Sequence, residues 1–335
     1  MKKRIAMLLV MHSLALLLVL HGNAQSNPPL KLVQKIPLPG VQGRMDHITV
    51  DVDGKRLFIP ANDEKQNTVE VIDLKAGKRI SSIPGQSRPQ GTFYSSDFNK
   101  LFVTNGTDGT YKIFRGDSFK LIDSLPLGAD ANQVGYDPDT KYLYAGFGDR
   151  NSGALAIIDT SSNQHIGDIK TDARPGGITF EKSGPRIFVN LNGATKLGVL
   201  DRKTREQIAT WSVTGAENYG PLALDEAHHR LFLGSRKPPM LIVFDIDSGR
   251  QITQLESVPS IDGLWYDAAR KRIYATGNGY IAVYNQKGAD DYTPMVKVAS
   301  EGDSQPSIWV PLFSRLYISV MQNGDRDAEI LVYEP

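Results

Sequence analysis

The chain has 335 residues, with 38 basic and 37 acidic side chains, a formal net charge of +1 and no cysteine. The lack of cysteine excludes disulfides, thiolate metal sites and cysteine nucleophiles. The balanced charge argues against a broad basic surface for binding nucleic acid. A chain without disulfides must be stabilised by burial, and its length is sufficient for a large core.

The N-terminal residues have the pattern of a secretory signal peptide. Residues 2–4 are basic, residues 5–20 are apolar, and Gly22 and Ala24 supply small side chains before the expected cleavage. This order predicts a signal peptide over residues 1–24. The apolar run is shorter than the roughly 20 residues of a membrane span, although an uncleaved N-terminal anchor is the alternative. Cleavage removes three of the 38 basic residues and no acidic one, which gives the mature chain a net charge of −2. The mature chain is therefore expected to be exported, either periplasmic or secreted, and to contain no membrane span.

A short motif recurs seven times in the rest of the chain. Each copy has Leu or Ile, then an aromatic residue, then small or β-branched residues, and a basic residue precedes most copies. Successive copies begin 42 to 44 residues apart, at Leu57, Leu101, Leu143, Ile187, Leu231, Ile273 and Leu316. A period of about 40 to 50 residues with strand-like content is typical of β-propeller blades. The sequence therefore predicts an all-β protein, with a single seven-bladed propeller over residues 25–335.

Each repeat divides into four short strands. In the fourth repeat we expect them at residues 177–181, 186–191, 197–201 and 207–213. The third strand ends in Asp in several repeats, which indicates a structural role in satisfying the amides of the following turn. The mature chain shows no long apolar period of 3.6 residues, so helix should be nearly absent.

The two chain ends predict how the ring closes. The seventh repeat ends with a third strand at residues 330–335 and lacks a fourth. Residues 32–38 precede the first repeat and are similar to the fourth-strand segment at residues 121–127. We therefore expect the N-terminal strand to complete the last blade, because closure of this kind removes unpaired strand edges.

The repeats resemble the YVTN-repeat, YncE-like family of exported β-propellers. The resemblance covers residues 30–335 and rests on the Pro-x-Gly sequences at 89–91 and 175–177, the Leu/Ile-aromatic strand, and the third strand that ends in Asp. It implies an exported propeller and says little about activity. Residues 174–177 and 304–307 depart from the pattern of the subgroup to which the first, third and fifth repeats are most similar, so a ligand shared by that subgroup does not follow from the resemblance.

Polar residues gather where the first strand of each repeat begins. In a propeller these positions line the central channel, and the loop after the second strand lies on the same face. They hold different residues in different repeats, as expected if each blade contributes a different contact to one ligand. The candidate ligand-binding residues are Asp46, His47, Gln90, Asn132, Asn218, Arg236 and Asp262. Further polar residues at the same mouth are Asp130, Arg150 and Arg174.

These residues favour the binding of a small polar or anionic ligand, or of a protein partner, by a chain that we expect to be a monomer. The alternative is a propeller enzyme of the lyase, lactonase or hydrolase type, with His47, Asp46 and Arg236 as its functional residues. His47 and Asp46 would then act as a base or hold a divalent cation with Asp262. No other cofactor is expected. A structural interpretation also stands, since a channel mouth filled with water is polar without any ligand. His228 and His229 are predicted to lie in a turn on the opposite face.

Overall fold

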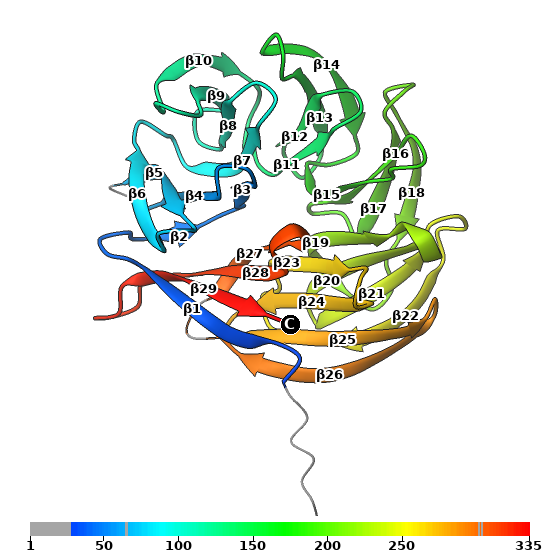
Figure 1. Ribbon diagram of the computed structural model, residues 1–335. Helices are drawn as coiled ribbons and strands as arrows, with labels where there is room; N and C mark the ends of the chain where they lie inside the picture. The colour runs from blue at the N-terminus through cyan, green and yellow to red at the C-terminus, as the bar shows by residue number, and fades with distance from the viewer. Residues whose placement is uncertain (1–27, 64–65, 301, 303) are drawn as a thin grey trace, which may run out of the picture.

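The computed structural model describes residues 28–63, 66–300, 302 and 304–335. This part of the chain forms seven antiparallel sheets arranged around a central axis, as Figure 1 shows. Each sheet is a blade of four strands, and in blade 1 the innermost strand is divided into two short pieces. The prediction of an all-β, seven-bladed propeller is confirmed. The predicted signal peptide lies outside the described residues.

The strands follow one another blade by blade. Blade 1 contains β2 (Arg44–Met45), β3 (Thr49–Asp51), β4 (Arg56–Asn62), β5 (Asn67–Asp73) and β6 (Lys78–Ile83). Blade 2 contains β7 (Pro89–Ser95), β8 (Lys100–Asn105), β9 (Thr110–Arg115) and β10 (Leu121–Pro126). Blade 3 contains β11 (Val134–Asp137), β12 (Tyr142–Gly148), β13 (Gly153–Asp159) and β14 (Gln164–Thr171). Blade 4 contains β15 (Pro175–Phe180), β16 (Arg186–Leu191), β17 (Lys196–Asp201) and β18 (Glu206–Ser212).

Blade 5 contains β19 (Glu217–Asp225), β20 (Arg230–Lys237), β21 (Pro239–Asp245) and β22 (Gln251–Glu256). Blade 6 contains β23 (Gly263–Asp267), β24 (Arg272–Gly277), β25 (Tyr280–Gly288) and β26 (Asp291–Ala299). Blade 7 contains β27 (Ser304–Val310), β28 (Arg315–Val320), β29 (Ala328–Glu334) and β1 (Lys31–Leu38). The helical segments in the described residues are two single 3-10 turns, η1 (Glu226–His228) and η2 (Pro311–Phe313). None of the helical segments seen there is long and apolar enough to cross a membrane.

The N-terminal strand closes the ring, as predicted. β1 pairs antiparallel with β29, the third strand of blade 7, and Ile36 lies opposite Ile330 in this register. Ile36 and Leu38 are fully buried. Arg272 of blade 6 also donates a hydrogen bond of 3.1 Å to the carbonyl of Pro29, just before β1. The outer strand of the last blade is therefore held by its own sheet and by the neighbouring blade.

The core lies between the blades, because each second strand is covered on both faces by neighbouring sheets. The aromatic residue of the repeated motif is buried in every blade, with an exposed fraction of at most 2 %. These residues are Phe58, Phe102, Tyr144, Phe188, Phe232, Tyr274 and Tyr317. Burial on both faces explains why the second strands are continuous apolar runs and do not alternate apolar and polar residues.

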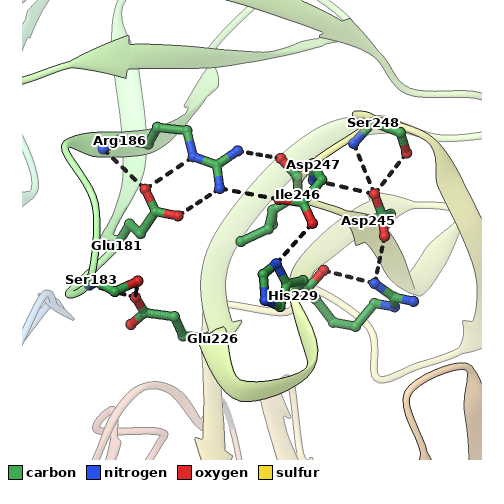
Figure 2. Close-up of polar contacts among 10 residues, drawn as sticks. Glu181, Ser183, Arg186, Glu226, His229, Asp245, Ile246, Asp247 and Ser248 are labelled. Atoms are coloured by element: carbon green, nitrogen blue, oxygen red, sulfur yellow. Dashed lines mark hydrogen bonds and ion pairs between the residues drawn. The ribbon is translucent and has the colours of Figure 1, made fainter.

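In blades 1, 2, 4 and 5 the basic residue that precedes the motif joins its blade to the next. Arg186 donates to both carboxylate oxygens of Glu181 in its own blade, at 3.0 and 2.6 Å, and to the carbonyl of Ile246 in blade 5 (Figure 2). Arg56, Lys100 and Arg230 make the same kind of contact with a group 60 residues further along. The recurrence of a basic residue in the sequence thus reflects contacts between blades.

The Asp that ends the third strand has the structural role that the sequence indicated. The carboxylate of Asp73 accepts the amides of Lys75 and Ala76, both at 2.8 Å, and Asp245 accepts the amide of Ser248 at 2.8 Å. These bonds satisfy turn amides that would otherwise have no protein partner. The Asp residues at the third-strand ends are therefore turn residues.

The two adjacent histidines lie in the turn between the first two strands of blade 5, as predicted. His228 contacts Asp225 at 2.7 Å. His229 contacts Asp247 at 2.8 Å, as Figure 2 shows. Each histidine side chain therefore contacts a carboxylate of its own blade.

Candidate ligand-binding site

A cavity of about 1120 Å³ opens where the first strands of blades 1 to 6 begin. Its wall also includes the loops that follow the second strands of blades 3 and 4, and the end of the second strand of blade 5. Six of the seven predicted residues line it, namely His47, Gln90, Asn132, Asn218, Arg236 and Asp262. Asp46 is 3 % exposed and lies behind the wall, where its carboxylate contacts His47 and Arg44. The structure therefore places the predicted residues around one cavity, whereas their role in binding stays a prediction.

The close approach of neighbouring first strands determines which side chains face the cavity. A Cβ on Gly91 would lie 2.5 Å from the carbonyl oxygen of Asn132 in the next blade, so this position requires glycine. His47 occupies the equivalent position of blade 1, and its amide donates to the carbonyl of Gln90 at 3.0 Å. With its backbone fixed against blade 2, His47 has its side chain at the cavity wall, 24 % exposed.

On the side of blades 1, 5 and 6, arginines and aspartates neutralise one another. Arg44 lies 3.4 Å from the carboxylate of Asp46 and 3.4 Å from that of Asp262. Arg236 forms an ion pair with the other oxygen of Asp262 and donates to the carbonyl of Tyr219 at 3.1 Å. Two guanidinium groups and two carboxylates thus form one connected cluster with no large net charge.

The buried carboxylate of Asp46 in this cluster has a raised pKa. Burial raises its pKa, whereas the neighbouring His47 and Arg44 act in the opposite direction. Burial prevails because the carboxylate has lost its water. Asp46 therefore carries its negative charge less readily than a carboxylate in solution.

On the side of blades 2, 3 and 4, arginines outnumber acids. Arg88 and Arg174 both form ion pairs with the carboxylate of Asp130, and Gln90 donates to it at 3.2 Å. Arg150 is exposed at the same side, and within the described part of the chain it has neither a hydrogen bond nor an ion pair. Two guanidinium groups therefore share the charge of Asp130, and that of Arg150 has no carboxylate partner in the described residues.

The nearby carboxylate of Asp149 offsets this excess only in part, because three guanidinium groups face two carboxylates on this side. It accepts the amides of Asn151 at 2.8 Å and Ser152 at 2.9 Å, and these bonds hold its pKa below the usual range. Its charge is thus engaged with the loop backbone. In total the cavity is lined by six Arg or Lys and four Asp or Glu residues, so the wall as a whole is positively charged.

The geometry gives little support to metal or acid–base chemistry at His47. In the part of the chain that the structure describes, no three His, Asp or Glu side chains come together as a metal site. The guanidinium of Arg44 lies between Asp46 and Asp262, where a cation bound by both carboxylates would have to be. His47 Nε2 is 3.4 Å from Asp46, longer than a catalytic hydrogen bond of about 2.6–3.2 Å. A divalent cation at these residues stays a prediction without further support.

Sequence analysis missed several lining residues, among them Arg44 and Arg88. Both occupy one position of the repeat, 13 residues before the leading Leu or Ile of the second strand. In blades 1 to 6 this position holds Arg44, Arg88, Asp130, Arg174, Asn218 and Ser260, all of which line the cavity. An alignment of the repeats at this position would have identified both arginines.

The fold and this cavity define the class of protein as a seven-bladed β-propeller with a cationic channel mouth. No family model matches the chain, and no curated protein sequence matches it. Solved structures share the fold. Hydrazine synthase of Kuenenia stuttgartiensis is 15 % identical with a TM-score of 0.73, and the match covers 82 % of this chain and 92 % of that one.

Two further structures are similar over most of their length. A chain in the crystal structure of a mitotic checkpoint complex is 13 % identical with a TM-score of 0.74, and the match covers 99 % of each chain. The β-propeller domain of Cps50 (Swd1) from Myceliophteria thermophila is 13 % identical with a TM-score of 0.68, and the match covers 92 % of this chain and 100 % of that one. At these identities the similarity shows the fold alone.

Proposed function

We propose that this chain is an exported, YncE-like propeller that binds a small anionic ligand at the mouth of its channel. The observation that carries this proposal is the convergence of basic side chains from five blades on one cavity. These are Arg44, Arg88, Arg150, Arg174, Arg236 and Lys237. These six basic residues outnumber the four acidic residues of the lining, and an anionic ligand would balance that excess.

The arginines of blades 2 and 4 are well suited to hold such a ligand. A guanidinium group presents several N–H donors in a fixed plane that matches carboxylate and phosphate oxygens. Asp130 holds Arg88 and Arg174 in place, and Gln90 supports Asp130. Because the side chains are ordered before the ligand arrives, binding costs less conformational entropy. The cavity volume of about 1120 Å³ is slightly above the usual range of small-molecule pockets, about 300–1,000 Å³.

The ligand proposal is tested with simple anions. We expect citrate or inorganic phosphate to raise the melting temperature and to give a saturable calorimetric signal. The double variant Arg88→Ala/Arg174→Ala should weaken this binding at least tenfold, since each hydrogen bond to a charged group contributes about 1.5–3 kcal/mol. The matched control is Arg115→Ala, at a pair of side chains that are each 58 % exposed, away from the cavity. Anion binding that is absent, or that survives the double variant unchanged, would contradict the proposal.

Export is proposed from the order of basic, apolar and small residues at the N-terminus. Mass spectrometry of the protein from its native host should find an N-terminus near Gln25. The control is the same measurement on a variant with Ala24→Asp, which should block cleavage and retain the full chain. Recovery of the native protein with its first 24 residues intact in a membrane fraction would refute export with cleavage.

A further inference from the structure

The excess positive charge of the cavity is confined to one wall, which we call the blade 2–4 wall. It consists of Arg88, Asp130, Asn132, Arg150, Arg174 and Asn192. These residues are continuous in space. Asp130 joins Arg88 to Arg174, the amide of Arg174 donates to the carbonyl of Asp149 at 2.7 Å, and the amide of Asn192 donates to the carbonyl of Arg174 at 2.9 Å. The opposite side holds the neutralised cluster of Arg44, Asp46, Asp262 and Arg236, so an anionic group is drawn to the blade 2–4 wall.

Free side-chain amides stand beside these arginines. Within the described residues, the side chains of Asn132 and Asn192 form no hydrogen bond with the protein, and both line the cavity. Each amide offers donors and an acceptor, which is the combination that hydroxyl groups require. Asn190, below this wall and 2 % exposed, donates to the carbonyl of Gly220 while its own oxygen has no partner in the described structure. The wall thus contains unused hydrogen-bonding capacity for an uncharged polar group.

The cavity wall is more polar than apolar, and among its described residues it exposes no aromatic or large aliphatic side chain to a ligand. Among its lining residues the single Phe, Tyr or Trp is Tyr219, which is 4 % exposed and donates its hydroxyl to the carbonyl of Ala216 at 2.9 Å. Leu191 is 1 % exposed. With no exposed ring for stacking and no open aliphatic pocket, the site gives no favourable environment to an aryl or acyl group. The ligand must therefore be polar over most of its surface.

From these features we infer that the ligand is a polyhydroxylated anion, such as a sugar acid or a sugar phosphate. Arg88, Arg150 and Arg174 bind its carboxylate or phosphate, and Asn132 and Asn192 bind its hydroxyl groups. This inference rests on the proposed anion site and specifies its ligand class. The inference predicts that the charge and the hydroxyl groups of the ligand both contribute to its affinity. A simple anion and a neutral sugar should therefore each bind more weakly than a sugar anion.

Calorimetry with five probes tests this inference on the full mature chain. The probes are glucuronate, glucose 6-phosphate, glucose, acetate and inorganic phosphate. Glucuronate should bind at least tenfold more tightly than both acetate and glucose if the anion is a carboxylate. If the anionic group is a phosphate, glucose 6-phosphate should likewise bind at least tenfold more tightly than both inorganic phosphate and glucose. If the simple anions bind as tightly as the sugar anions, the inference is overturned while the proposed anion site stands. If no probe binds, the inference is overturned, and the binding experiment with citrate described above decides whether the proposed anion site exists.

A pair of variants separates the amides from the arginines. Asn132→Leu/Asn192→Leu should weaken binding of the preferred sugar anion at least tenfold and leave inorganic phosphate unchanged, because the guanidinium groups remain. Asn285→Leu, on β25 and outside the cavity lining, is the matched control and should change neither affinity. An equal loss for the sugar anion and for phosphate would show that the amides only maintain the arginines, and it would overturn their assignment to hydroxyl groups.

Discussion

Deletion of residues 25 to 40 is expected to remove most of the stability of the fold and to make the protein associate. The deleted segment contains β1, which is the outer strand of blade 7. Leu30, Ile36 and Leu38 have exposed fractions of 2, 0 and 0 %. Burial of such a side chain contributes about 1.5–3 kcal/mol, so the three together account for about 5–9 kcal/mol. This is comparable with the whole free energy of unfolding of a typical domain, about 5–15 kcal/mol.

The association has a separate cause. Without β1, the backbone groups of β29 that now pair with it along the register from Lys31 to Leu38 would be unpaired. An open strand edge of this length is a template for pairing with another chain. Thermal unfolding and size-exclusion chromatography measure the two effects. Two single variants are the controls. Ile36→Ala should lower the free energy of unfolding by about 2–5 kcal/mol. Leu32→Ala should lower it much less, because the Leu32 side chain is 37 % exposed. A truncated protein that melts like the parent and stays monomeric would show that β1 is not needed for closure.

The fold could be predicted from the sequence because its stabilising contacts repeat. Every second strand lies between two neighbouring blades, so the same Leu/Ile-aromatic motif is required in each, and the motif gave the number of blades directly. Strand ends were less predictable. β15 begins at Pro175, two residues before the expected start, because Pro175 pairs with Leu191 and a bulge follows before Ile178. Proline and glycine in the sequence favour a loop, and only the pairing partner shows that this segment belongs to the sheet.

The candidate site was partly predictable for a different reason. Its position follows from the repeat, which places six of the seven predicted side chains around one cavity. The electrostatics of the site do not follow from the repeat, because they depend on ion pairs between residues of different blades. Arg44 and Asp262 are 218 residues apart in the chain, and Arg88 and Asp130 belong to different blades. Asp46 belongs to the same position of the repeat as Gln90, yet it is buried and pairs with Arg44, a difference between blades that the repeat pattern does not show.

Substitution of Arg186 by Met is expected to destabilise the propeller by about 3–5 kcal/mol, the usual cost of removing one partner of a buried ion pair. The guanidinium of Arg186 in blade 4 donates a hydrogen bond to the carbonyl of Ile246 in blade 5 (Figure 2). Its partner Glu181 is 7 % exposed, so the variant would leave a carboxylate buried without a cation. Urea unfolding measures the loss. The matched control is Arg115→Met, since Arg115 and its partner Asp117 are each 58 % exposed and an exposed pair of this kind contributes about 0–1 kcal/mol.

A second variant distinguishes the loss of charge pairing from the loss of contact between blades. In Glu181→Leu/Arg186→Met no buried charge remains, so about half or more of the lost stability should return if the unpaired carboxylate is the main cost. If the double variant is as unstable as Arg186→Met, the hydrogen bond from Arg186 to the Ile246 carbonyl carries the stability instead. The repeated contact over 60 residues at Arg56, Lys100 and Arg230 would then be the principal connection between blades. If Arg186→Met lowers the free energy of unfolding by less than about 1 kcal/mol, both explanations are contradicted, because a solvent-exposed ion pair contributes that much.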